Sequence, residues 1–323
     1  MPRVSILLIA YQQQATIARA IGGALAQTYA PLEIVISDDA SNDGTFAAMQ
    51  AAVAGYAGPH RVVLNHNPHN LGIGAHLSHL VGLSSGELLF VAAGDDVSLP
   101  QRCESVVRAW LAHARQPDLI ASALVDMDEA GGLHAPIVPS ELQRYRSVAD
   151  WLANPPFVVG AAQAWTRRLF ERFGPLPAGV VAEDMIMVFR AIGSGGALTL
   201  PEPLVGYGRG GISRRVRNLC AQDVVERVLK NNRHALVEHE QLLRDARTMG
   251  QLEAVQAVFD AKLKRERFIR DVFAAPGMGR QVGIALRARG VSAGLRLRMW
   301  LYAAWPGVYA PFFFLKRLLT RER

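Results

Sequence analysis

Residues 33–45 read Glu-Ile-Val-Ile-Ser-Asp-Asp-Ala-Ser-Asn-Asp-Gly-Thr, and this stretch decides the class of fold. The apolar run Leu32–Ser37 has the length and composition of a buried strand. Two carboxylates, Asp38 and Asp39, follow it at once. The polar cluster that comes next predicts a turn and a helix N-terminus, and Thr45–Val53 is then predicted to be a helix. A strand followed by a helix is the unit whose repetition along the chain indicates an α/β protein.

The same alternation of strand and helix extends through the first 125 residues. Apolar runs predict further strands, and segments with helical spacing predict the helices between them. The predicted strands are Val4–Ala10, Arg61–Leu64, Leu88–Ala92 and Leu119–Val125, and the predicted helices are Thr16–Gln27, Ala75–Leu83 and about 100–113. This order predicts a parallel, doubly wound sheet, in which ligands bind beyond the carboxyl ends of the strands.

The remainder of the chain is less regular at first and then helical. Short helix patterns occur at Thr166–Phe173 and Asp184–Ile192 within the irregular region 126–208. From about residue 219 onward, Asp223–Arg247 and Leu252–Phe273 predict long amphipathic helices.

Composition and charge narrow the class of protein. Half of the 323 residues are apolar and 20% are charged, which excludes a disordered, collagen-like or simple coiled-coil chain. Two cysteines cannot form a disulfide framework, and the apolar run at the N-terminus is too short for a signal peptide, so we expect a cytoplasmic protein. The net charge of +7 is unevenly distributed, because residues 1–208 carry −6 and residues 209–323 carry +13. The basic C-terminal third is therefore expected to meet an anionic partner.

Two further carboxylate pairs lie where strands end or helices begin. Asp95-Asp96 follows the strand Leu88–Ala92, and Glu183-Asp184 precedes a helix pattern. Hard oxygen ligands suit Mg²⁺ or Mn²⁺ held against a diphosphate. The alternative for either strand-end pair is a turn or a helix cap. The pairs Asp38-Asp39 and Asp95-Asp96 both follow strands of the same predicted sheet. Two pairs at one edge of a sheet favour a shared cleft.

Several motifs in order resemble the opening of family 2 glycosyltransferases with the GT-A fold. The matching segments are Val4–Tyr11, Leu25–Tyr29, Glu33–Thr45, Asn70–Gly72, Ser85–Glu87, Ala93–Asp96 and Glu183-Asp184. The resemblance covers about residues 3–213. It implies a GT-A catalytic domain at 1–215, with a nucleotide-sugar-binding half (1–125) and an acceptor half (126–215). A helical, basic region follows at 216–323.

The resemblance also implies roles for individual residues. The chain would transfer a sugar from a nucleotide-diphosphate donor to a hydroxyl of a glycan or lipid-linked acceptor, with inversion at the anomeric carbon. Ala10 and Tyr11 would wrap the base, Asp39 would accept from a base N–H, one of Asp95 and Asp96 would contact the ribose, and Asp96 would bind Mg²⁺ or Mn²⁺ at the diphosphate. Asp184 would be the catalytic base, and Glu183 would orient it or raise its pKa.

The chain departs from the family pattern at two places. Ala93 stands where many relatives have an aspartate, so metal ligation rests on fewer carboxylates. No histidine occurs in Tyr207–Ser213, where many relatives have one. Arg209 or Arg214 is then expected to supply positive charge to the phosphates. The alternative is a mobile glycine-rich loop with solvated arginines.

The sequence around the remaining histidines and aromatic residues suggests where each lies and what it does. His76 and His79 lack a zinc ligand set, so we expect them at the surface or at the cleft edge. Trp151, Phe157 and Trp165 are candidates for stacking on sugar rings, with a core role favoured for Trp165.

The C-terminal segment 291–323 combines an apolar stretch with basic flanks. Met299–Leu315 is 17 uncharged residues broken by prolines, too short and kinked to span a bilayer. We expect a helix in the interface at the inner face of the cytoplasmic membrane, which suits a lipid-linked acceptor in O-antigen, capsule or exopolysaccharide synthesis. The alternatives are packing on the catalytic domain or a dimer contact.

Two other classes of function are weighed against the enzyme. A nucleic-acid-binding protein is disfavoured, because the aromatic residues form an apolar block and do not alternate with basic ones. A non-catalytic relative that binds nucleotide sugars stays open. The sequence predicts neither the donor sugar nor the oligomeric state.

Overall fold

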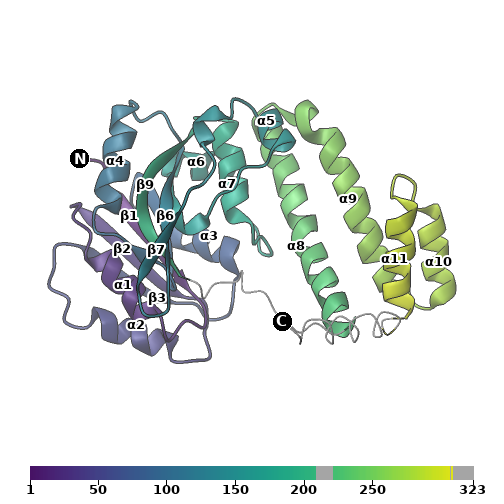
Figure 1. Cartoon of the computed structure of the whole chain (residues 1–323), viewed down its shortest axis with the longest axis horizontal. Coiled ribbons are helices and arrows are strands. Elements are labelled where there is room, and N and C mark those ends of the chain that lie inside the picture. The colour runs from purple at the N-terminus through teal and green to yellow at the C-terminus, as the bar shows by residue number, and fades with distance from the viewer. Residues whose placement is uncertain (209–220, 306, 308–323) are drawn as a thin grey trace. The chain divides into compact units, whose positions relative to one another are not determined.

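A computed structural model describes residues 1–208, 221–305 and 307 of the chain. The chain divides into two compact units (Figure 1). Unit 1 comprises Met1–Arg214 and Arg244–Ala254, and unit 2 comprises Arg215–Leu243 and Val255–Arg323.

Four parallel strands form one half of the sheet in unit 1. They are β1 (Val4–Ala10), β2 (Leu32–Asp38), β3 (Arg61–His66) and β4 (Leu88–Ala93), in the order β3-β2-β1-β4. Every residue of β1 and β2 is buried, as expected for parallel strands covered on both faces. The strands predicted here from apolar runs are confirmed.

The other half of the sheet is mixed. The short strand β8 (Gln163–Thr166) runs antiparallel to both β4 and β6 (Leu119–Met127), so it separates β6 from the parallel set. The strand β9 (Ala197–Gly208) lies parallel to β6, and β5 (Val97–Ser98) pairs antiparallel with β9. An antiparallel strand β7 (Leu133–Ile137) pairs with β6. The expectation of a wholly parallel sheet therefore holds only for the first four strands.

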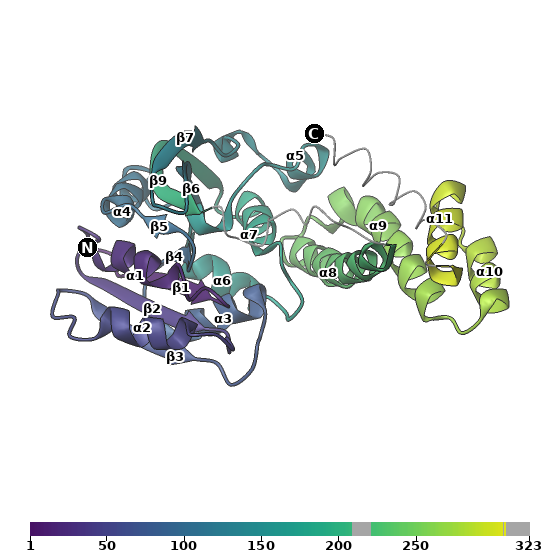
Figure 2. The same ribbon diagram turned by 60° about the horizontal axis from the view of Figure 1, so that its bottom comes forward.

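Helices cover both faces of this sheet (Figures 1 and 2). Their bounds are α1 Ile17–Leu25, α2 Thr45–Val53, α3 Ile73–Leu83, α4 Arg102–Ala112, α5 Val148–Ala153, α6 Arg167–Phe173 and α7 Glu183–Ile192, with short 3₁₀ turns at Leu142–Arg144 and Gly160–Ala162. Side chains of α1, α2 and α4 share one core with alternate residues of β1, β2 and β4. The helix α3 contacts β1 and β2, and α7 contacts β6 and β9.

A buried ion pair joins α7 to the segment Arg244–Ala254 of unit 1. The guanidinium of Arg190 in α7 donates to both oxygens of Asp245, at 2.7 and 3.2 Å. Asp245 lies near the end of α8 (Ala221–Thr248). Both side chains are almost completely buried. Such a pair holds α7 firmly, because removing one partner of a buried ion pair is strongly destabilising.

Unit 2 consists of helices in its described part. They are most of α8, α9 (Leu252–Ala274), α10 (Met278–Arg287) and α11 (Ala293–Ala304). Their core contains Phe268, Ile269, Val272, Val291 and Met299. The side chain of Asn232 in α8 donates 2.8 Å hydrogen bonds to the carbonyl and carboxylate of Glu266 in α9. Within the described ranges, no helix is both long and apolar enough to cross a bilayer.

Candidate active site

The acid pairs predicted at strand ends do lie at one edge of the sheet. In the strand register Ala10 stands beside Asp38 on one side, and Ile9 stands beside Ala93 on the other. The backbone N–H of Asp39 donates to the Ala10 carbonyl at 2.9 Å. The carboxyl ends of β2, β1 and β4 therefore bring Asp39, Ala10 and the Asp95-Asp96 pair to the same edge, where open α/β sheets bind ligands.

Asp95 and Asp96 occupy a tight turn between β4 and β5. The amide of Gln13 donates to Asp95 Oδ1 at 2.9 Å, and the backbone N–H of Gly208 donates to Asp96 Oδ1 at 2.7 Å. A Cβ atom at Gly208 would lie 2.2 Å from the Asp95 carbonyl oxygen. The end of β9 can approach this turn only because residue 208 is glycine.

Burial changes the acidity of both carboxyl groups. It raises the pKa of Asp95 above its ordinary value, even though Gln13 donates to this group. The pKa of Asp96 rises to about 8, first through burial and then through the neighbouring charge of Asp95. The Gly208 N–H and the buried guanidinium of Arg102 oppose that rise. Two adjacent carboxyl groups with so few donors are costly to ionise, and a cation would relieve this cost.

The donor set at this turn suits a divalent cation that also binds the substrate. No cluster of three or more His, Cys, Asp or Glu side chains suited to a metal occurs in residues 1–208, 221–305 and 307. Mg²⁺ and similar cations are commonly held by one or two carboxylates together with substrate phosphates. Asp95 and Asp96 offer two adjacent carboxylates of this kind.

A cavity of about 450 Å³ opens beside Asp95. Its lining consists of Gln12, Gln13, Gln14, Ala15, Thr16, Asp43 and Asp95. Tyr11 precedes this loop and is 46% exposed, so its ring is available to a ligand, whereas Ala10 is buried in β1. The loop after β1 thus forms one wall of a cavity that reaches the acidic turn.

Asp39 is buried and already holds several hydrogen bonds. Its Oδ1 accepts from the Asn67 amide at 2.8 Å and from the Leu71 N–H at 2.9 Å. Its Oδ2 accepts from the Gly72 N–H at 2.9 Å. Asp39 therefore fixes the loop that leads into α3. Its Oδ2 accepts one hydrogen bond where Oδ1 accepts two, and Nδ1 of His76 lies 4.0 Å from Oδ2.

His76 differs from the surface or cleft-edge position expected of it. Its side chain is almost completely buried, and its Nε2 lies 2.7 Å from the hydroxyl of Ser37. Burial lowers the pKa of His76 to about 4, so the imidazole is neutral at physiological pH. His76 belongs to the polar network beneath Asp39.

Asp184 and Glu183 begin the helix α7. Asp184 is partly exposed, and its Oδ1 accepts from the backbone N–H of Met185 at 2.7 Å. Glu183 is only 5% exposed. A Cβ atom at Gly160 would lie 2.6 Å from Glu183 Oε1, so the glycine leaves room for that carboxylate. A helix N-terminus stabilises negative charge at these positions.

Gln163 of β8 connects α7 with the buried side chain of Arg102. Its side-chain amide donates to the backbone carbonyl of Asp184 at 3.3 Å. Its backbone carbonyl accepts from the guanidinium of Arg102, also at 3.3 Å. Arg102 is fully buried and bonds Ser98 at 2.9 Å. Sequence reasoning missed Gln13, Arg102 and Gln163. The one feature of the sequence that could have indicated them is that they are polar residues close to apolar strands.

The remaining predicted residues divide three ways. Trp165 is fully buried, as expected, and Trp151 is also buried, with its ring 5.0 Å from that of Phe189. Phe157 is 54% exposed and stays available for stacking. Arg209 lies outside the residues that the structure describes.

Comparison with known proteins identifies the family. The family model described as "Glycosyl transferase family 2" matches residues 5–171, which is more than half of the chain. The chain belongs to glycosyl transferase family 2. The match covers β1 to β4 and the acidic turn, so the family resemblance inferred from the motifs is confirmed.

Curated family 2 relatives come from bacteria. EpsE of Bacillus subtilis (strain 168), a candidate glycosyltransferase, is 33% identical over 139 residues, covering 43% of this chain and 49% of EpsE. The succinoglycan biosynthesis protein ExoO of Rhizobium meliloti (strain 1021) is 28% identical over 234 residues, covering 67% of this chain and 64% of ExoO. The chain thus spans about half of EpsE and just under two thirds of ExoO.

Solved structures of glycosyl transferases share the fold. TarS 1–349 of S. aureus, in complex with UDP-GlcNAc, is 16% identical, covers 94% of this chain and 87% of that chain, and has a TM-score of 0.53. The mannosyltransferase PcManGT of Pyrobaculum calidifontis, with GDP-Man and Mn²⁺, is 17% identical, covers 96% and 87%, and has a TM-score of 0.55. The expected GT-A fold with a helical C-terminal region is therefore confirmed.

Proposed function

We propose that the protein is an inverting glycosyltransferase that moves a sugar from a nucleotide-diphosphate donor to a hydroxyl of an acceptor. The observation that carries this proposal is the buried Asp95-Asp96 turn beside the cavity at the carboxyl edge of the sheet. Family membership supports the reaction class. The polar connection through Gln163 supports a role for α7 in the same site.

Residues at the sheet edge bind and orient the donor. Tyr11 and Ala10 contact the base, and Asp39 Oδ2 accepts from a base N–H. Asp95 contacts the ribose, and Asp96 holds Mg²⁺ or Mn²⁺. When bound, the cation offsets the negative charge of the leaving nucleoside diphosphate. Gln13 and the Gly208 N–H fix the two carboxylates in the required orientation.

Asp184 acts as the catalytic base. Its carboxylate takes the proton from the acceptor hydroxyl while that oxygen attacks the anomeric carbon and the bond to the diphosphate breaks. Glu183 and the Gln163 amide position it at the start of α7. A single displacement of this kind inverts the anomeric configuration. Arg209 is proposed to pair with the donor phosphates.

Bacterial surface polysaccharide synthesis is the proposed setting. The name of ExoO places that relative in succinoglycan biosynthesis, which supports an extracellular glycan as the product. We propose a glycan or lipid-linked acceptor at the inner face of the cytoplasmic membrane. Attachment would be through the segment 291–323, and membrane fractionation after deletion of 308–323 tests the contribution of the C-terminal part of that segment.

The test of the enzyme proposal is release of nucleoside diphosphate. A panel of nucleotide sugars is first screened for thermal stabilisation with and without Mn²⁺, since a true donor raises the melting temperature by mass action. Turnover of the selected donor is then compared between wild type and Asp184→Asn. Release by wild type and loss in the variant supports catalysis with Asp184 as base. Binding without turnover in either protein would indicate a non-catalytic relative.

A further inference from the structure

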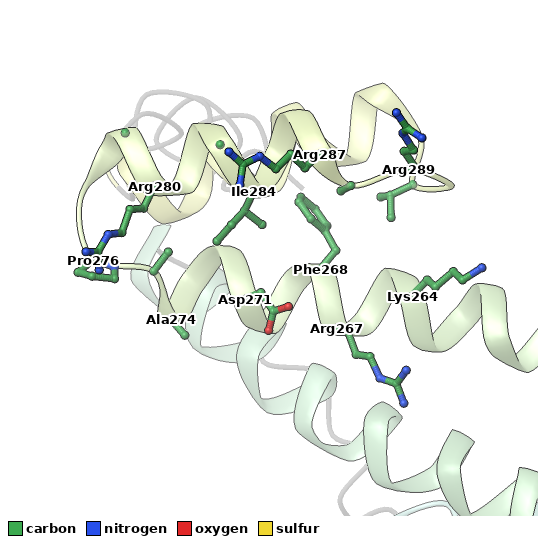
Figure 3. A pocket seen from close by; sticks show the side chains of 15 residues that line it. Lys264, Arg267, Phe268, Asp271, Ala274, Pro276, Arg280, Ile284, Arg287 and Arg289 are labelled. Carbon is green, nitrogen blue, oxygen red and sulfur yellow. The ribbon is translucent and has the colours of Figure 1, made fainter.

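A groove in unit 2 lies between α9 and α10 (Figure 3). Its volume is about 1000 Å³. The lining includes five basic side chains and one acidic side chain: Lys264, Arg267, Arg280, Arg287, Arg289 and Asp271. The groove therefore concentrates positive charge within the basic third of the chain.

Most of this charge has no counter-ion in the described part of the chain. Arg267 points away from α10, and its guanidinium lies 3.5 Å from Glu240 (Figure 3). Asp271 pairs with Arg270 at 2.9 Å. The four other cations are exposed and form no ion pair with any residue that the structure describes: Lys264, Arg280, Arg287 and Arg289. An anion entering the groove would thus meet unneutralised cations.

The floor of the groove is apolar. Ile284 from α10 packs on the core that contains the buried Phe268 of α9, and both residues line the groove, with Arg280 toward one end and Arg289 toward the other (Figure 3). Gly279 and Gly283 also line it, and a Cβ atom at either position would meet nothing within 4 Å. A ligand with both an anionic group and an aliphatic part matches this combination of surfaces.

The helix α10 also exposes large apolar side chains. Met278 is 45% exposed and Leu286 is 74% exposed. They lie on the same short helix as Arg280 and Arg287. At helical spacing Met278 and Leu286 lie on a different face of α10 from Arg280 and Arg287. A helix with cations on one face and exposed apolar side chains on another is typical of a membrane interface. A soluble phosphate or a nucleic acid would use the cations and leave the apolar surface in water.

We propose that this groove binds the phosphate group of an anionic membrane phospholipid, with the lipid chain against Ile284 and the open surface at Gly279 and Gly283. Arg280 and Arg287 supply the charge at the phosphate, while Met278 and Leu286 enter the interface. This inference deepens the proposed membrane attachment and rests on it, but it places the lipid contact at 264–291, in residues before the Met299–Leu315 stretch.

The experiment is co-sedimentation of the full chain with lipid vesicles. Wild type is expected to bind phosphatidylcholine–phosphatidylglycerol vesicles and to bind pure phosphatidylcholine vesicles much more weakly. The double variant Arg280→Gln/Arg287→Gln should bind the mixed vesicles about thirtyfold more weakly, from roughly fivefold per basic residue at an anionic surface. Arg280→Lys/Arg287→Lys should retain most of the binding.

A matched control removes the same charge elsewhere in unit 2. Arg227 and Arg233 are exposed on α8, and neither lines the groove. Arg227→Gln/Arg233→Gln should change binding by less than about threefold. An equal loss in this control would show that net charge alone drives binding and would overturn the proposal. Unchanged binding by Arg280→Gln/Arg287→Gln would overturn it as well.

Two further arms distinguish lipid binding in the groove from binding of a soluble anion and from attachment through the tail. Inorganic phosphate at millimolar concentration should not release the protein from vesicles, and full release would assign the groove to a soluble anion and overturn the proposal. Deletion of 308–323 tests the tail independently. If that deletion abolishes binding while the groove variant binds normally, the tail attachment stands and the groove inference fails. The melting temperature of the groove variant should equal that of wild type, which shows that its fold is intact.

Discussion

Replacing Asp96 with asparagine is expected to stabilise the metal-free protein while abolishing its use of a cation. The carboxyl group is 6% exposed, and its Oδ1 accepts from the Gly208 N–H. An asparagine amide keeps an acceptor for this N–H and has nearly the same shape. What it removes is the buried ionisable group beside Asp95.

The magnitude follows from the pKa of Asp96, which rises from 3.8 to about 8 on folding. Between these two values the folded state binds a proton that the unfolded state has released. The free energy of unfolding of wild type therefore falls as pH rises through this window, by up to about 1.4 kcal/mol per pH unit. From pH 5 to pH 8 this amounts to about 4 kcal/mol, which Asp96→Asn should not lose.

The assay is urea unfolding at pH 5, 6, 7 and 8 in the presence of a chelator. The stability of Asp96→Asn relative to wild type should grow steadily across the series. Asp150→Asn is the control, because hydrogen bonds from the backbone N–H of Arg146 and from Ser147 already hold the pKa of Asp150 below its ordinary value. Asp150 is thus ionised in both states across this range, and its substitution should add no slope.

Two results would refute the reasoning. One is an identical pH dependence in wild type and Asp96→Asn, which would mean that Asp96 ionises without penalty. The other is an equal stabilisation of both proteins by Mn²⁺ with a nucleoside diphosphate. Ligand at about 100 times its Kd should add about 2.7 kcal/mol to wild type and much less to the variant.

Three further substitutions probe other parts of unit 1. Asp184→Asn should lower kcat/KM by about 10²–10⁴, with an unfolding midpoint close to wild type; full activity would exclude it as base. Gly208→Ala places a methyl group 2.2 Å from the Asp95 carbonyl oxygen, so β9 must shift, and both thermal stability and donor affinity should fall; an unchanged melting temperature would show that the strand end yields freely. Arg190→Met removes the buried ion pair with Asp245 and should cost about 3–5 kcal/mol in urea unfolding, a loss that Arg190→Met/Asp245→Leu should reduce.

The parallel half of the sheet was predictable because its strands are buried on both faces. Continuous apolar runs such as Val4–Ala10 and Leu88–Ala92 carry that signal in the sequence alone. The other half was not. The strand β8 has four residues, β5 has two, and β9 contains Pro201 and Pro203, so none presents a regular pattern. Their pairing depends on tertiary contacts with β6 and β4.

The site was predictable to a similar extent. Strand ends and family motifs located Asp39, Asp95 and Asp96 at one edge, but they gave no indication of what holds each carboxylate. Gln13 reaches Asp95 from the loop after β1, and Gln163 reaches the start of α7 from β8. Hydrogen bonds between residues 21 to 82 positions apart depend on the folded arrangement, and a local pattern does not encode them.

Asp39 accepts hydrogen bonds from the backbone N–H groups of Leu71 and Gly72. These bonds limit which substitutions of Asp39 the chain can tolerate. The carboxylate proposed to recognise the base also anchors the entrance to α3. A substitution of Asp39 that changed recognition of the base would also remove the hydrogen bonds that hold the start of α3. Selection for a different nucleotide at this position would therefore be limited by the loss of stability. Adaptation to another base is therefore expected at Tyr11, whose exposed ring can vary without disturbing the scaffold.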